Sequence, residues 1–131
     1  LWHGILGHDG EPNARLAEVA RLRAELAAAA PWIAGTLPAP VAAVLSDYPS
    51  RFSCEVMPEA PGFSYEAQAE ACFAALVSER LATGVLTAGA DWSGVRLLVA
   101  PSLRCVDEAL AARLEGFVAE GGTLVLLPRA G

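Results

Sequence analysis

One stretch near the C-terminal end of the chain constrains the fold most, because its hydrophobic period changes twice. Residues 97–100 are an unbroken apolar run closed by Pro101, which is typical of a strand buried on both faces. Over residues 107–120, apolar residues recur every three or four positions behind an N-cap at Asp107, which predicts a helix with one inward stripe. Residues 123–127 form a second apolar run, closed by Pro128, which predicts another buried strand. This order predicts a right-handed crossover between parallel strands, and therefore a parallel α/β layer.

The remainder of the chain extends this layer. The predicted elements are, in order, a helix over residues 13–30 ended by Pro31, a strand over 41–45, a loop over 51–63, a helix from Ser64 up to Gly84, and a strand over 85–87. Together with the last three elements, this spacing favours an open parallel sheet with strand order 2-1-3-4 and flavodoxin-like winding. We therefore predict a three-layer α/β fold with helices on both faces of the sheet.

Composition and charge exclude several classes of function. A hydrophobic share of 54% is too high for a disordered chain, and no apolar run approaches the roughly 20 residues that a membrane span needs. The formal net charge of -6 offers no basic surface to nucleic acid or to anionic lipid. Cys54, Cys72 and Cys105 lack the spacing of a metal site and cannot all pair, which favours buried thiols in a reducing, cytoplasmic compartment.

In a sheet of this kind, ligands bind where the chain leaves the carboxyl ends of the strands. The candidate residues at these positions are Asp47, Tyr48, Ser50, Pro101, Ser102 and Arg129. The segment after the first strand lacks the glycines of a phosphate-binding loop, and the chain has no glycine-flanked Cys or Ser turn with a His partner. Cys105 follows a strand without that frame. We therefore predict no catalytic residue and no bound cofactor in this sheet.

The N-terminal loop LWHGILGHDGEP is dense in functional groups for its length. His3, His8 and Asp9 are residue types that bind several divalent ions, but their spacing is not diagnostic and we predict no metal site. Trp2 and Trp32 are predicted to anchor the core or an interface.

Several segments, taken in order, resemble the middle of glycoside hydrolase family 42 β-galactosidases over nearly the whole chain. The segments are the HGxxxHDG loop from His3 to Gly10, the strand exit Asp47-Tyr48-x-Ser50, the strand end Ala100-Pro101, and the pair Val118-x-x-Gly121-Gly122. Each segment is a weak signal alone, whereas their shared order makes the resemblance specific.

The resemblance implies that residues 13–131 form part of the trimerisation domain of that family, an α/β layer similar to class I glutamine amidotransferases but without their nucleophile. Residues 1–12 would end a preceding (β/α)8 barrel, whose two glutamates perform retaining hydrolysis of terminal β-galactosides. It also implies that His3 lines the galactose subsite in the full-length enzyme, and that the partners are further copies in a homotrimer and the barrel itself. Because the chain stops just past a predicted strand, we expect the domain to be truncated at its C-terminal side.

Two other functions remain open at this point. An independent amidotransferase-like hydrolase would use Cys105 or Ser102 as its nucleophile. A module that binds small ligands would use the strand exit from Asp47 to Ser50. The resemblance favours a non-catalytic oligomerisation domain over both.

Overall fold

The computed structural model describes residues 5–58 and 60–128. The chain forms two compact units, of which the first ends at Leu37 and the second begins at Pro38. Within the described residues, the first unit contains one helix, and the second contains four strands and three helices.

The helix of the first unit is α1 (Ala14–Ile33), whose N-cap Asn13 accepts hydrogen bonds from two backbone N–H groups of the first turn. The prediction that Pro31 ends this helix is wrong, because Pro31 lies inside it. Proline removes one donor from the helical ladder, but the ladder resumes beyond it: the N–H of Ala34 donates to the carbonyl of Ala30 over 2.9 Å. Every residue of α1 is described and none is buried, so α1 has no core of its own.

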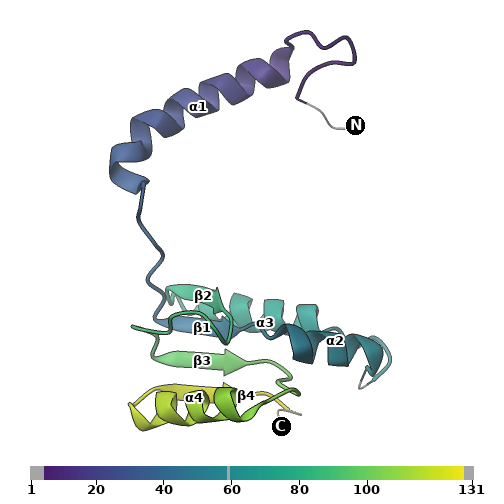
Figure 1. Cartoon of the computed structure of the whole chain (residues 1–131), viewed down its shortest axis with the longest axis vertical. Coiled ribbons are helices and arrows are strands. Elements are labelled where there is room, and N and C mark those ends of the chain that lie inside the picture. The colour runs from purple at the N-terminus through teal and green to yellow at the C-terminus, as the bar shows by residue number, and fades with distance from the viewer. Residues whose placement is uncertain (1–4, 59, 129–131) are drawn as a thin grey trace. The chain divides into compact units, whose positions relative to one another are not determined.

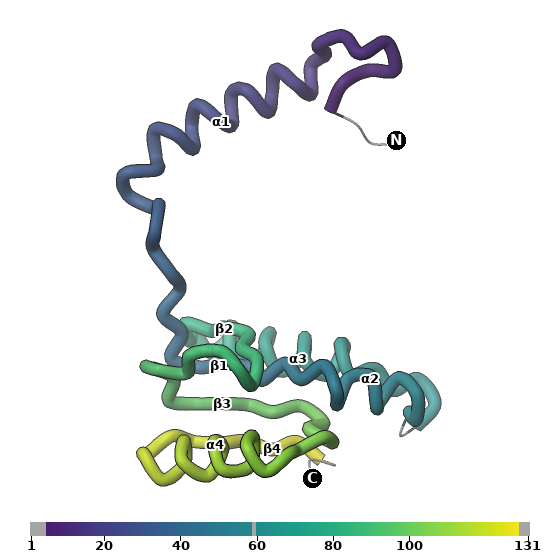
Figure 2. Tube along the Cα trace, in the orientation of Figure 1, coloured from purple at the N-terminus to yellow at the C-terminus, as the bar shows by residue number. Residues whose placement is uncertain are grey.

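The second unit is a parallel sheet covered by helices (Figure 1). Its elements in chain order are β1 (Ala42–Leu45), α2 (Tyr48–Val56), α3 (Tyr65–Ser78), β2 (Thr83–Leu86), β3 (Leu97–Ala100), α4 (Glu108–Ala119) and β4 (Thr123–Leu126). The strands lie in the order β2-β1-β3-β4, and all three neighbouring pairs are parallel. The predicted order 2-1-3-4 is confirmed, and Figure 2 traces the crossovers that produce it.

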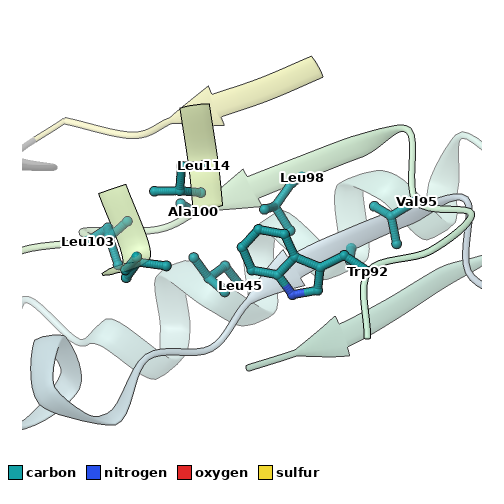
Figure 3. Packing of buried hydrophobic residues seen from close by; sticks show 9 residues of the cluster. Leu45, Trp92, Val95, Leu98, Ala100, Leu103 and Leu114 are labelled. Atoms are coloured by element: carbon teal, nitrogen blue, oxygen red, sulfur yellow. The ribbon is translucent and has the colours of Figure 1, made fainter. Parts of the chain in front are cut away.

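Both faces of the two central strands, β1 and β3, are buried, as their apolar runs predicted. The prediction of a buried strand at β4 is wrong, because this outer strand is mostly exposed. One face carries the larger core cluster, in which α4 packs on the sheet through Leu110 and Leu114, together with Ala43, Leu45, Leu98 and Ala100 (Figure 3). The opposite face packs against α3 through Leu76, together with Ala42, Val44 and Val99. Neighbouring residues of one strand join different clusters because successive side chains point to opposite faces. The three-layer prediction is therefore confirmed.

The prediction of a loop over residues 51–63 is wrong in its first half, which belongs to α2. Asp47 is the N-cap of α2, and Pro49 lies in its first turn, where a missing N–H costs no intrahelical bond. Sequence reasoning missed this helix although its apolar residues recur at helical spacing, and it gave no sign that the buried residues would be Ser50 and Cys54.

The helix after Ser64 is shorter than predicted. Ser64 is its N-cap, as expected, and accepts a hydrogen bond from the N–H of Ala67 over 3.1 Å. The helix ends at Ser78, where Arg80 adopts a left-handed conformation with φ of 59°. Gly84 instead lies within β2, and a Cβ atom at this position would lie 3.0 Å from the ring of Pro40. This glycine serves close packing rather than the helix end.

A core residue that the sequence did not reveal is Trp92, in the turn before β3. Its side chain is 7% exposed and lies among the residues of the larger core cluster (Figure 3). Its indole N–H donates to the carbonyl of Thr87 over 3.0 Å, and its ring meets Phe117 edge-on at 6.0 Å. Trp32, by contrast, is 83% exposed and is not a core residue.

Candidate functional site at the carboxyl edge of the sheet

The carboxyl edge of the sheet gathers most of the candidate residues. Four of them are buried: Asp47, Ser50, Pro101 and Ser102. Tyr48 is exposed, and Arg129 lies outside the described residues, as does His3. The segments that follow the parallel strands therefore lie at one edge of the sheet, as predicted. The hydrogen-bond partners of each buried group show the role of that group.

Asp47 lies where β1 passes into α2, and its polar groups are used within the fold. Its carboxylate accepts a hydrogen bond from the N–H of Ser50 over 2.8 Å, and its own N–H donates to the hydroxyl oxygen of Tyr65 over 3.0 Å. Burial is the largest cause that raises the pKa of Tyr65, so its phenol stays neutral at physiological pH. These contacts join β1, α2 and α3.

Ser50 is fully buried, and its hydroxyl oxygen accepts two backbone hydrogen bonds. The donors are the N–H groups of Arg104 and Cys105, each at 2.9 Å, in the loop after β3. The guanidinium of Arg104 reaches back to α2 and donates to the carbonyls of Ser53 and Met57, at 3.3 and 2.9 Å. These carbonyls lie at the C-terminal end of α2, where the helix dipole favours a cation. Ser50 and Arg104 therefore fasten α2 to the loop.

Ser102 is buried directly after β3, in a left-handed conformation with φ of 36°. Its hydroxyl donates to the side-chain amide oxygen of Gln68 on α3, over 2.8 Å. An activated serine donates instead to a base that can take its proton, and an amide oxygen is not such a base. This geometry does not support Ser102 as the nucleophile of a hydrolase.

A cleft of about 770 Å³ opens beside this edge. Its two carboxylates, Asp47 and Asp107, both serve as helix N-caps, and Asp107 accepts from the N–H of Leu110 over 2.7 Å. Its cation, Arg113, donates to backbone carbonyls of the turn before β3 and stacks over the ring of Trp92 at 3.9 Å. The charged groups of the cleft therefore hold the fold together.

The three cysteines differ in exposure. Cys54 is buried, Cys72 is half-buried on α3 and Cys105 is exposed at the cleft, and all three are free thiols. Burial raises the pKa of Cys72, as expected for a thiol packed beside the core. The prediction of buried thiols is thus wrong for Cys105, which lies in an exposed loop.

The residues considered as metal ligands, for which no metal site was predicted, lie in the first unit, apart from this edge in sequence. His8 and Asp9 are exposed, and the Asp9 carboxylate accepts a hydrogen bond from the N–H of Glu11 over 3.1 Å. Within residues 5–58 and 60–128, no three His, Cys, Asp or Glu residues are grouped so as to hold a metal ion. The helices of that same part of the chain include none that is long and apolar enough to cross a membrane.

Sequence reasoning missed three residues of this edge, namely Tyr65, Gln68 and Arg104. Each contacts a buried group that lies 18 or more residues away along the chain. Tyr65 and Gln68 share one face of α3, three residues apart, and this polar pair in the first turn was the available signal.

One protein family, described as the beta-galactosidase trimerisation domain, matches residues 40–131. The chain belongs to this family. The matched range begins two residues after the start of the second compact unit, so the family likeness covers the sheet and its helices.

The likeness to individual relatives covers both units. β-Galactosidase Bga of Halorubrum lacusprofundi is 37% identical over 128 residues, which cover 98% of this chain and 18% of the relative. β-Galactosidase BgaA of Clostridium cellulovorans is 28% identical over 131 residues, which are 20% of its length. The chain therefore spans about a fifth of the curated relatives that it matches.

Solved structures show the same relation. The β-galactosidase from Bacillus circulans sp. alkalophilus superposes with a TM-score of 0.81 at 26% identity, over 98% of this chain and 19% of that one. The enzyme from Halorubrum lacusprofundi superposes with a TM-score of 0.75 at 35% identity, over 96% and 18%. The resemblance to glycoside hydrolase family 42 is confirmed.

Proposed function

We propose that this chain acts through its surface, as the part of a β-galactosidase that assembles copies of the enzyme into a trimer. The observation that carries the proposal is the carboxyl edge of the sheet. The chain belongs to the trimerisation family, and the buried polar side chains at this edge form hydrogen bonds within the chain itself. These side chains are Asp47, Ser50 and Ser102. Polar groups that are already hydrogen-bonded within the fold stabilise the domain and are not available to bind a substrate.

The activity proposed for the whole enzyme is removal of terminal β-galactose residues. The chemistry would be retaining hydrolysis by two glutamates in a (β/α)8 barrel that this chain does not contain. Its relatives are named β-galactosidases, and they are about five times longer than the matched segment. We place the enzyme in the cytoplasm, with no cofactor.

The N-terminal residues belong to this proposal as the junction with the barrel. Residues 1–12 would close the barrel and residues 13–131 would belong to the trimerisation domain. His3 would contact galactose only in the full-length enzyme. Replacing His3 with Ala there should raise KM for a galactoside and leave the sedimentation mass unchanged. Unchanged KM and kcat would refute this role.

Sedimentation equilibrium of the chain tests the assembly proposal directly. Over a hundredfold range of concentration, we expect the mass to rise to three times that of one chain, since a closed trimer has a defined mass. A monomer at every concentration would refute self-association through this chain. Continued growth beyond three chains would refute a closed trimer.

A further inference from the structure

Helix α2 presents a row of apolar side chains to solvent. Tyr48, Phe52 and Val56 recur every four residues, so they lie on one face of the helix, and Met57 follows directly. Their side chains are 57%, 55%, 80% and 62% exposed, in that order. The rings of Tyr48 and Phe52 lie 6.1 Å apart and form a continuous aromatic surface. We refer to these four residues as the α2 stripe.

The polarity of α2 is the reverse of that expected for a surface helix. A surface helix normally buries its apolar face and exposes its polar face. In α2 the buried residues are Ser50 and Cys54, which are 0% and 3% exposed, and the aromatic residues point outward. The stripe is therefore not the side of α2 that stabilises its own unit.

Contacts on the other sides of α2 hold the stripe in place. Ser50 and Arg104 fasten the inner face to the loop after β3. On its flank, Arg51 pairs with Glu55 over 3.0 Å and with Glu66 of α3 over 2.5 Å. The helix extends beyond the carboxyl end of β1 (Figure 1), and these contacts hold its other sides while the stripe stays exposed. Such preorganisation lowers the entropic cost of association.

A second apolar surface of the unit has a different character. It is a groove of about 580 Å³ between α4 and β4, lined by aliphatic residues such as Leu103, Val118 and Leu126. It borders β4, an outer strand of the described sheet, and an outer strand accepts further backbone hydrogen bonds. Protein–protein interfaces are instead enriched in aromatic residues and Met. The α2 stripe has that composition.

We propose that the α2 stripe is a contact surface for a second copy of this chain. The choice of occupant rests on the proposed function, because the family is described as a trimerisation domain. More than half of the surface of Tyr48 and of Phe52 is exposed, which leaves roughly 100 Å² per residue for contact. One partner contributes about 800 Å² to a standard interface, so the stripe supplies its centre and neighbouring surface supplies the remainder. Central aromatic residues carry most of the free energy of binding.

Lysine substitutions at matched positions test this surface on the full chain. Phe52→Lys and Val56→Lys place a charge in the stripe, and Lys near a helix C-terminus favours the helix itself. The controls are Val77→Lys and Val118→Lys, which change valines that are each 48% exposed in the last turns of α3 and α4. Sedimentation equilibrium gives the mass, and circular dichroism with the melting temperature shows that each variant is folded.

We expect Phe52→Lys and Val56→Lys to weaken association by about tenfold or more, as typical for a lost interface hot spot, with both controls at the wild-type level. Stripe variants that assemble as the wild type does would overturn the inference while the proposed function stands. Loss of assembly in Val118→Lys alone would overturn it in favour of the groove beside β4. A wild-type chain that is monomeric throughout would overturn both the proposed function and this inference.

Discussion

Helices α4 and α2 begin in the same way, but α4 buries its apolar face whereas α2 buries its more polar face. Each starts at an aspartate N-cap at the carboxyl edge of the sheet, Asp107 for α4 and Asp47 for α2. Helix α4 buries Leu110 and Leu114 against the sheet, whereas α2 buries a serine and a cysteine and exposes its aromatic residues. The apolar side chains of α4 therefore contribute to the core, whereas those of α2 do not.

The contrast shows that an apolar residue in a helix does not itself indicate which surface will cover it. The buried side of α4 is selected by the hydrophobic effect, since apolar area is removed from water. The buried side of α2 is selected by hydrogen bonds, since Ser50 provides an acceptor for two backbone donors. The outward residues of α2 are then available to another molecule.

The largest expected difference between the two helices is in core stability. Leu114→Ala in α4 should lower the free energy of unfolding by about 2–5 kcal/mol, because it removes a buried side chain and leaves a cavity. Phe52→Ala in α2 should change it by less than about 0.5 kcal/mol, because the ring is mostly exposed. Urea denaturation at concentrations where the chain is monomeric checks both. Similar losses would mean that the stripe is covered within a single chain.

The polar inner face of α2 provides a test of intermediate size. Ser50→Ala removes the buried hydroxyl that accepts from the N–H groups of Arg104 and Cys105, and at about 0.5–1.5 kcal/mol for each lost hydrogen bond it should cost about 1–3 kcal/mol. Ser78→Ala is the control, because that exposed hydroxyl donates only to a carbonyl of its own helix. Urea denaturation measures both. A Ser50→Ala variant as stable as the control would show that water replaces the serine and that α2 is not held by this contact.

The smallest expected effects have opposite signs at two glycines of the α4 region. Gly116→Ala should stabilise by about 1 kcal/mol, because an added Cβ atom meets open space within a helix. Gly122→Ala should destabilise by about 1 kcal/mol, because its Cβ atom would lie 2.5 Å from the ring of Phe117. The melting temperatures measure the pair. Shifts of the same sign would contradict the tight packing of this helix end.

Most of the fold could be predicted from the sequence because its signals are local. Strands of four apolar residues, aspartate and serine N-caps, and the left-handed Gly121 after α4 are recognised within a few positions of the chain. Spacing between them was sufficient for the strand order, since parallel neighbours need a crossover. The failures included the ends of α1 and α3, and also α2 and Trp92, whose burial depends on partners outside their own segments.

The candidate site was only partly predictable. The rule for parallel sheets correctly placed Asp47, Ser50 and Ser102 at one edge, because the carboxyl ends of parallel strands meet there. It did not indicate that each would be bound by other parts of the fold. Their partners include Tyr65 and Arg104, which belong to no motif that the sequence analysis identified.

The sequence by itself determined the parallel α/β layer, its strand order and the family, because buried strands, helix caps and their order along the chain are written in neighbouring residues. Only the tertiary structure decided that the carboxyl edge is a set of structural hydrogen bonds and that the aromatic side of α2 faces solvent. The physical reason is that hydrogen-bond satisfaction and burial depend on segments far apart in sequence. Ser50 and Cys105 are 55 residues apart in the chain, yet the Cys105 backbone nitrogen lies 2.9 Å from the Ser50 hydroxyl oxygen.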